Sequence, residues 1–163
     1  LRPSINEFGQ EGYKTIAYEL MLAREEIDDI FIPVSSGVCL VGVFKGFNRF
    51  FKLPKIHLCQ PSANALLSSL YDNDFIKEEK GLASSLVAKT HPLKEKILEA
   101  VAKTNGTGWT ISNTEILTAQ SKLEERKIVT SNEGALALAA VYKARNKGWK
   151  LGRTVVLLTG RRY

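Results

Sequence analysis

Short apolar runs alternate along this chain with amphipathic stretches, and the alternation predicts strands and helices in turn. A short, mostly apolar run bounded by turn-forming residues is typical of a strand that is buried on both faces of a parallel sheet. The predicted strands span residues 30–34, 55–61, 109–111 and 154–160.

Between these strands, apolar side chains recur every three or four positions, which places them on one face of a helix. Ile16, Leu20 and Ala23 have this spacing in the first predicted helix. Ser112 and Glu115 form the pattern of a capping box, in which two side chains bind free N–H groups at a helix start. The predicted helices span residues 12–26, 38–51, 64–71, 92–104, 113–126 and 133–146.

This order of elements predicts an α/β fold, with an open, mostly parallel sheet and helices on both faces. The 163 residues suffice for one core, and no repeat, low-complexity segment or interdomain linker divides them. With 44% hydrophobic and 25% charged residues, the composition is that of a folded domain rather than a disordered chain. No apolar run approaches the ~20 residues of a membrane-spanning helix, so we expect no membrane association.

The cysteines and histidines argue against a metal site or a disulfide scaffold. Cys39 and Cys59 lie in apolar stretches without a C-x-x-C pattern, and His57 and His91 complete no zinc motif. We expect two buried thiols in a reducing compartment, and hence a cytoplasmic protein without a metal.

The net charge of +6 is concentrated at one end, because residues 134–163 contain seven basic side chains and no acidic one. Such an end can bind nucleic acid or another anion. Aromatic residues are not interleaved with the basic ones, however, so no platform for stacking bases is visible. We therefore expect a solvated helix face or a surface for an acidic partner, and no nucleic acid.

The most informative stretch is the junction between the first predicted strand and the helix that follows it. The strand ends in Ser35, Ser36 and Gly37, and the helix begins at once with Val38 and Cys39. Ligands of parallel sheets lie at the carboxyl ends of strands, and a helix start offers unpaired N–H groups and a positive dipole end to an anion. The junction is therefore a candidate phosphate site, although Ser and Gly are also usual in any strand-to-helix turn. It matches neither the P-loop nor the G-x-G-x-x-G pattern.

Other polar residues are weaker candidates. Thr159, near the carboxyl end of the last predicted strand, would point into the same crevice, unless it only ends the strand. Glu133 at a helix start is better explained by stabilisation of the helix dipole than by catalysis. Lys14 near another helix start is more often simply exposed. Neither histidine has a nucleophile paired with it in the sequence, so we assign no catalytic residue.

Several segments together resemble one enzyme family. Residues 11–19 resemble the E-G-x-K-T-x-A-x-E segment of threonine synthases, and residues 33–46 resemble their phosphate loop and the following helix. Further similar segments follow in the same order, at residues 83–92, 113–117, 133–140 and 155–160. The ordered set is similar to the fold-type II enzymes that use pyridoxal phosphate, which include threonine synthase, threonine dehydratase, cysteine synthase and the tryptophan synthase β subunit.

This resemblance implies the tryptophan synthase β-like fold, with residues 1–163 as one α/β segment, the carboxyl-terminal half of the large domain. The Schiff-base lysine and the small domain of the family lie upstream of the matched region, so we expect this chain alone to be inactive. The resemblance also implies that pyridoxal 5′-phosphate is the cofactor and that Thr159 contacts its pyridine nitrogen. The cofactor phosphate would bind to the backbone N–H groups of Ser35, Ser36, Gly37, Val38 and Cys39.

For the intact protein, the resemblance implies a homodimer that converts O-phosphohomoserine and water to threonine and phosphate. Three alternatives remain open. The enzyme could be another amino-acid lyase or synthase of the family, such as threonine or serine dehydratase or cysteine synthase. The chain could be a non-catalytic split or degenerate half that pairs with a partner chain. A nucleotide-binding α/β domain is a weaker third alternative.

Overall fold

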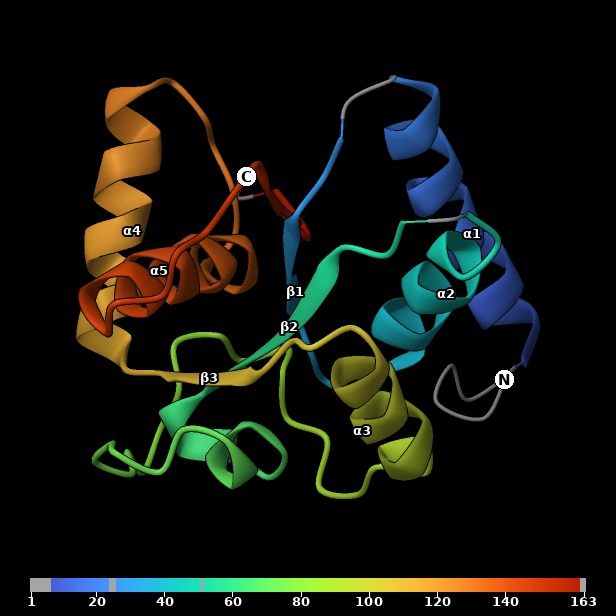
Figure 1. Cartoon of the computed structure of the whole chain (residues 1–163). Coiled ribbons are helices and arrows are strands. Elements are labelled where there is room, and N and C mark those ends of the chain that lie inside the picture. The colour runs from blue at the N-terminus through green and yellow to red at the C-terminus, as the bar shows by residue number, and fades with distance from the viewer. Residues whose placement is uncertain (1–6, 24–25, 51, 162–163) are drawn as a thin grey trace.

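The described residues, which are 7–23, 26–50 and 52–161 of this computed structural model, form one open parallel sheet with helices around it (Figure 1). Each neighbouring pair of strands is parallel, and every residue of the central strand β1 is buried. The strands are β1 (Asp29–Pro33), β2 (Lys55–Pro61), β3 (Gly108–Ile111) and β4 (Thr154–Val156), in the spatial order β3-β2-β1-β4.

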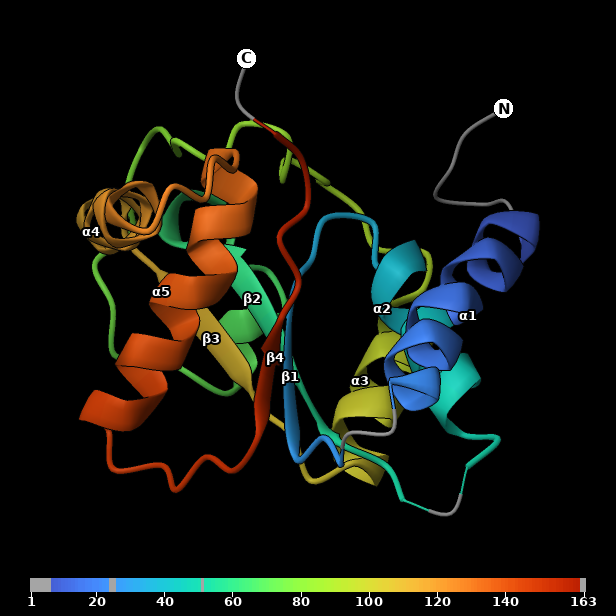
Figure 2. The ribbon, with the colours of Figure 1, turned by 90° about the horizontal axis from the view of Figure 1, so that it is seen from above.

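Helices cover both faces of this sheet, as predicted (Figure 2). One face carries α1 (Glu7–Leu22), α2 (Val38–Phe47) and α3 (Lys94–Lys103), and the other carries α4 (Asn113–Glu125) and α5 (Asn132–Asn146). The alternating side chains of the strands divide accordingly between two apolar clusters. Ile30 and Ile32 of β1 belong to the first cluster, whereas Phe31 belongs to the second. The predicted α/β fold is therefore confirmed.

Helices α1 and α2 approach each other closely because α2 carries glycine at two positions one turn apart. A Cβ atom at Gly42 would lie 2.5 Å from Cβ of Tyr13, and one at Gly46 would lie 2.7 Å from Cβ of Ala17. No larger side chain fits between the two helix backbones. This packing fixes α1 along the side of α2.

The first helix begins and ends earlier than predicted. It starts at Glu7 rather than at residue 12, and Gln10, which is buried, accepts a hydrogen bond at Oε1 from Nζ of Lys45 on α2 (2.7 Å). It ends at Leu22 rather than at residue 26, because Asp28 is already bonded to Arg153 at the sheet edge. Residues 24–25 of the prediction lie outside the described residues.

The helix predicted at 64–71 is wrong. Two short 3₁₀ turns, Ser62–Asn64 and Ser68–Leu70, stand there instead. The side chain of Gln60 explains the break, since its Oε1 accepts hydrogen bonds from the N–H groups of Leu67 (2.8 Å) and Ser68 (2.9 Å). A contact with a residue from the preceding strand has thus replaced bonds that a helix would make within itself.

Two further boundaries differ from the prediction by four residues each, and the remaining ones agree within two residues. Helix α2 ends at Phe47, because Phe50 N–H bonds to the Phe47 carbonyl in a tighter turn; residue 51 lies outside the described residues. Strand β4 ends at Val156 rather than at residue 160, and its residues are half-buried rather than buried. The reason is that β4 pairs only with β1, so that its other edge bears no strand within the described part of the chain.

The basic end of the chain is partly structural. The side chain of Asp72 is 3% exposed, and it forms ion pairs with Nζ of Lys143 (2.7 Å) and Nζ of Lys147 (2.8 Å) on α5. Burial acts to raise the pKa of Asp72, but the hydrogen bonds from the two lysines outweigh it and hold that pKa below its usual value. At least two of the seven basic side chains therefore neutralise a buried acid rather than form the solvated face that we expected; Arg162 lies outside the described residues.

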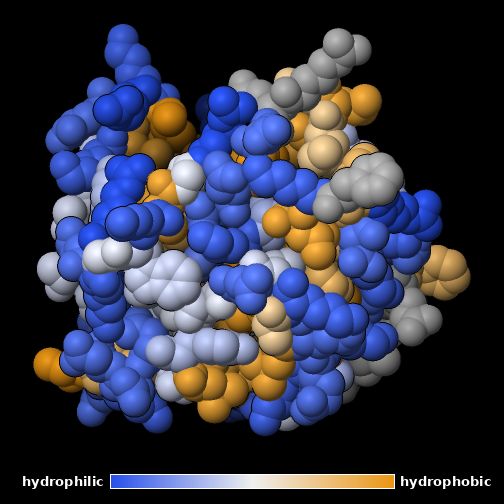
Figure 3. Space-filling model, in the orientation of Figure 1, coloured by the Kyte–Doolittle hydropathy of each residue, from blue (hydrophilic) through white to orange (hydrophobic). Residues whose placement is uncertain are grey.

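The rest of the surface is mainly polar on the side that Figure 3 shows, with apolar side chains in separate groups. Within the described residues, no helix is long and apolar enough to cross a membrane. Cys39 and Cys59 are free thiols; Cys59 is buried as predicted, whereas Cys39 is only half-buried.

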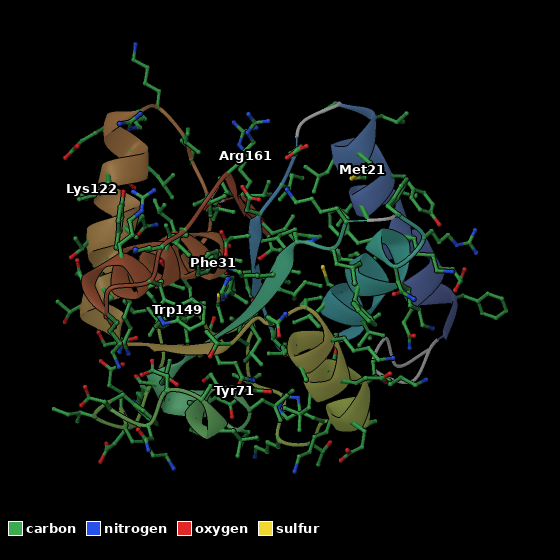
Figure 4. All side chains as sticks on the ribbon, viewed as in Figure 1. Met21, Phe31, Tyr71, Lys122, Trp149 and Arg161 are labelled. Carbon is green, nitrogen blue, oxygen red and sulfur yellow. The ribbon has the colours of Figure 1, made fainter. Side chains whose placement is uncertain are left out.

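A buried polar cluster joins β1, β2 and β3 on the α5 side of the sheet, where Figure 4 shows Phe31 and Trp149. The indole N–H of Trp109 donates to Nδ1 of His57 (3.3 Å), and Nε2 of His57 lies 3.1 Å from Oδ1 of Asp29. Because an indole nitrogen can only donate, the proton of the neutral imidazole lies on Nε2 and is donated to Asp29. The ring also stacks on Phe31, with centroids 4.3 Å apart.

This cluster makes the stability of the fold dependent on pH. Burial lowers the pKa of His57, although the hydrogen bond with Asp29 opposes the shift. The unfolded chain, in which histidine has a pKa near ~6.5, therefore binds more protons below that pH than the folded one does. We predict that the free energy of unfolding, measured by urea denaturation, falls as the pH drops below about 6.5, by up to ~1.4 kcal/mol per pH unit for this group.

The substitution His57→Gln should remove part of this slope, and the part due to His91, whose pKa burial also lowers, should remain. An unchanged slope in His57→Gln would contradict the assignment.

Candidate functional site

From β1 the chain adds β2 and β3 on one side of the sheet, and it then returns to add β4 on the other side of β1. The chain passes from β1 through α2 to β2 on one side of β1, and β4 later pairs with β1 on the other side. In open parallel sheets the connections part at such a switch point and leave a crevice at the carboxyl ends of the strands, where ligands bind. The segments that follow β1 and β4 both lead into this crevice.

A cavity of about 380 Å³ occupies the crevice, which is within the usual size range of small-molecule sites. All six residues that the sequence singled out as cofactor-binding candidates line it, although they come from two segments more than a hundred residues apart. The complete lining consists of Gly9, Tyr13, Pro33, Ser35, Ser36, Gly37, Val38, Cys39, Leu86 and Thr159.

We call residues 35–39 the anion loop. Its backbone is turned into α2 by Gly37, which has a left-handed φ of 86°. A Cβ atom there would also lie 2.2 Å from Cδ1 of Ile97 on α3, so both the conformation and the packing require glycine. The first backbone bond of α2 runs from the N–H of Val41 to the carbonyl of Gly37 (3.0 Å), and no side chain caps the helix. The N–H groups of the first turn are therefore available to a ligand.

The electrostatics of the cavity favour an anion. None of its lining residues is an aspartate, glutamate, lysine, arginine or histidine. Burial raises the pKa of the Cys39 thiol to about 11, which keeps this side chain neutral near pH 7. A negative group would therefore meet hydroxyls, amide N–H groups and the positive end of the α2 dipole, and no repelling carboxylate.

A half-buried imidazole, that of His91, lies next to the backbone of the anion loop. Both ring nitrogens of His91 are buried, and neither forms a hydrogen bond of normal geometry within the described part of the chain, although the Ser35 backbone lies close enough to interact with the ring. Burial lowers the pKa of His91, and the backbone of Ser35 in the anion loop opposes that shift only in part. His91 is therefore held neutral against the loop rather than serving as a second positive charge for the anion.

Four of the lining residues were not anticipated as site residues, and one of them, Pro33, is the last residue of β1. Gly9 and Tyr13 come from α1, and Leu86 comes from the loop before α3. A signal for Gly9 and Tyr13 was present, since the glycines at 42 and 46 indicate a helix that packs closely against α2. No pattern in the sequence points to Leu86.

The weaker candidates lie elsewhere. Lys14 does not line the cavity and pairs with Glu11 on the same helix (2.5 Å). His57 belongs to strand β2, and its side chain is buried in the cluster with Asp29 and Trp109 that was described above. Glu133 accepts a hydrogen bond from the backbone N–H of Ser85 (3.0 Å), which is a structural role. Among the described residues that line the cavity there is no lysine.

Comparison with known proteins supplies the family. A family model described as "Pyridoxal-phosphate dependent enzyme" matches residues 1–160. The chain belongs to this family. A threonine synthase of Halalkalibacterium halodurans is 28% identical over 166 residues, which cover 96% of this chain and 46% of that protein. A threonine synthase of Methanocaldococcus jannaschii is 26% identical over 159 residues, which cover 89% and 39%. The chain thus spans less than half the length of these relatives.

Solved structures show the same fold. Serine racemase from Dictyostelium discoideum superposes with a TM-score of 0.76 at 22% identity, over 94% of this chain and 50% of that one. Maize serine racemase gives a TM-score of 0.78 at 22% identity, over 95% and 49%. A T.th. threonine deaminase gives a TM-score of 0.75 at 22% identity, over 94% and 57%. The fold predicted from the resemblance to the fold-type II enzymes is therefore confirmed.

Pyridoxal 5′-phosphate is the cofactor of this family, and the cavity fits it. The uncapped start of α2 offers N–H donors to a phosphate group, and the neutral lining leaves that charge unopposed. Thr159 brings a hydroxyl to the same cavity from the segment after β4.

The anion loop yields a direct test. We predict that Gly37→Ala lowers the free energy of unfolding by at least ~1–2 kcal/mol, the cost of a left-handed L-residue, and weakens binding of pyridoxal phosphate. Urea denaturation and fluorescence titration measure the two effects. Gly12→Ala is the matched control: Gly12 is exposed inside α1, and its Cβ would meet nothing within 4 Å, so this change should stabilise the protein by ~0.5–1 kcal/mol. A Gly37→Ala protein that matches the wild type in both measurements would contradict the assigned geometry.

Proposed function

We propose that this chain is the carboxyl-terminal half of the large domain of a threonine synthase-like enzyme. The intact enzyme converts O-phosphohomoserine and water to threonine and phosphate. One observation carries the proposal: the anion loop and Thr159 line a single cavity at the switch point of the sheet. The similarity to two threonine synthases supports the choice of reaction within the family.

Each element of the cavity has a definite part in this proposal. The N–H groups of Ser35, Ser36, Gly37, Val38 and Cys39 bind the cofactor phosphate. The hydroxyl of Thr159 forms a hydrogen bond with the pyridine nitrogen. A hydroxyl can donate or accept, so it does not force a proton onto the ring as a carboxylate would. When bound, the cofactor withdraws electrons from the substrate α-carbon, and a less strongly protonated ring tempers this effect in a way that suits elimination and replacement.

The lysine that holds the cofactor covalently belongs, in this proposal, to a part of the enzyme outside this chain. The absence of a lysine among the described lining residues supports this division, as does the pairing of Lys14 with Glu11. The outer edge of β4 is open within the described chain, and Leu158 just beyond it is 39% exposed. A free strand edge readily accepts another strand. We place the remainder of the large domain there, with the small domain beyond it.

The whole protein is, on this proposal, a cytoplasmic homodimer with a small amino acid as its substrate. The two free thiols fit a reducing compartment. An amino-acid dehydratase is the main competing function. The solved structures of a serine racemase and a threonine deaminase have the same fold, and at 22% identity they do not select between reactions.

An assay with alternative substrates tests the reaction. We predict that the full-length protein, loaded with pyridoxal phosphate, releases threonine and inorganic phosphate from O-phosphohomoserine in equal amounts. It should form little 2-oxobutanoate from threonine or pyruvate from serine. Rapid deamination of either amino acid, with O-phosphohomoserine unchanged, would instead identify a dehydratase.

Substitutions at Thr159 test its role in the same assay. Thr159→Val removes the hydroxyl while keeping the shape of the side chain, and we predict a loss of about fivefold or more in kcat/KM, as expected for one hydrogen bond. Thr159→Ser keeps the hydroxyl and should retain most of the activity. Equal activity of the valine and serine variants would refute the assigned contact.

A further inference from the structure

The segment that carries Thr159 is not held by the sheet. Regular strand structure in β4 ends at Val156, and the last bond to β1 is donated by the N–H of Leu157 to the carbonyl of Phe31 (3.1 Å). Beyond that point the chain is irregular. Some other contact must therefore fix Thr159 in the wall of the cavity.

That contact comes from the residues immediately before α5, which lie beside the segment after β4 (Figure 2). The hydroxyl of Ser131 donates to the carbonyl of Thr159 (2.8 Å), and the N–H of Ser131 donates to the carbonyl of Gly160 (3.2 Å). The hydroxyl of Thr130, a buried residue, donates to the same Gly160 carbonyl (3.0 Å). Three hydrogen bonds thus tie two consecutive peptide groups to the start of α5.

The hydroxyl of Ser131 has a second role at the start of α5. Ser131 is the N-cap of α5, and its Oγ accepts a hydrogen bond from the N–H of Gly134 (3.4 Å). A serine hydroxyl has one proton and can accept through its lone pairs. Since the helix N–H is bound to a lone pair, the proton is available to an acceptor; the Thr159 carbonyl lies at 2.8 Å, and the Glu133 carboxylate is a second acceptor nearby.

The same turn of α5 also contacts the loop that contributes Leu86 to the lining of the cavity. The side chain of Asn132 donates to the carbonyl of Leu82 (3.0 Å), and Oε1 of Glu133 accepts from the N–H of Ser85, the residue before Leu86 (3.0 Å). Burial acts to raise the pKa of Glu133, but the hydrogen bond from the Ser85 backbone and further bonds hold it below its usual value, so the group is a carboxylate at neutral pH. The start of α5 is therefore bonded both to the segment that carries Thr159 and to the loop that carries Leu86.

We propose that Ser131 is a positioning residue, which sets the place of the Thr159 hydroxyl in the cofactor cavity through its bond to the Thr159 carbonyl. The inference rests on the proposed function for the identity of the ligand. The bond itself is a contact between two residues of this chain. Ser131 acts through Thr159 and does not line the cavity.

Substitutions separate positioning from helix capping. Asp is as good an N-cap as Ser, so Ser131→Asp keeps the acceptor for Gly134 but has no proton to donate to Thr159 at neutral pH. Ser131→Thr keeps both the acceptor and the donor. Ser112→Ala is the matched control for capping, because Ser112 caps α4 and does not line the cavity. Ser131→Ala and Ser112→Ala should both lower Tm by a few degrees.

Two readouts on the full-length protein test the proposal. Without added cofactor, hydrogen exchange of the peptide that spans residues 157–161 should be about fivefold faster in Ser131→Asp, the change expected for one lost hydrogen bond. With pyridoxal phosphate, the dissociation constant should rise about fivefold in the same variant, and the absorbance maximum of the bound cofactor should shift. Ser131→Thr should match the wild type, and Ser112→Ala should alter neither readout.

Unchanged exchange and unchanged binding in Ser131→Asp would overturn the proposal, as would equal effects of Ser112→Ala and Ser131→Ala on hydrogen exchange and on cofactor binding. The proposed function fails in a different way. In that case the wild type itself does not bind pyridoxal phosphate, and hydrogen exchange in the absence of the cofactor still decides whether Ser131 holds the segment.

Discussion

The left-handed backbone at Gly37 is the constraint on which the site depends. It lets the chain leave β1 and enter α2 within four residues, so that the first N–H groups of the helix face the crevice rather than the core. The side chain of Ile97 on α3 occupies the space that a Cβ atom of Gly37 would need, so the turn is also fixed by packing. An anion bound there is stabilised by backbone geometry, since no charged side chain lines the cavity.

Two separate contacts position the other residues that line the cavity. The close approach of α1 to α2, which glycines at 42 and 46 permit, brings Tyr13 to one side of the cavity. The start of α5 forms hydrogen bonds with the segment after β4, and these bonds hold Thr159 in the lining of the cavity. Binding groups thus come from this chain, whereas the proposal assigns the covalent step to a lysine elsewhere in the enzyme. Such a division is consistent with the presence of this cavity in a chain that spans less than half the length of its relatives.

Local patterns predicted the features that depend on local forces. The buried strand at 55–61 and the capping box of Ser112 and Glu115 are both confirmed. The errors occur where a distant side chain competes with local bonding, as when Gln60 binds N–H groups that were expected to be helical. That Thr159 lines the same cavity as the anion loop follows from the strand order, which periodicity does not encode. Ser131 was missed because a serine before a helix is already explained as a cap, and nothing in the sequence indicates its second bond.

A crystal structure of the full-length protein with pyridoxal phosphate tests the central claim most directly. The account predicts that the phosphate lies within hydrogen-bond distance of backbone N–H groups in residues 35–39, and that Oγ1 of Thr159 contacts the ring nitrogen. A cofactor phosphate held by side chains at some other place, with the anion loop empty, would contradict it.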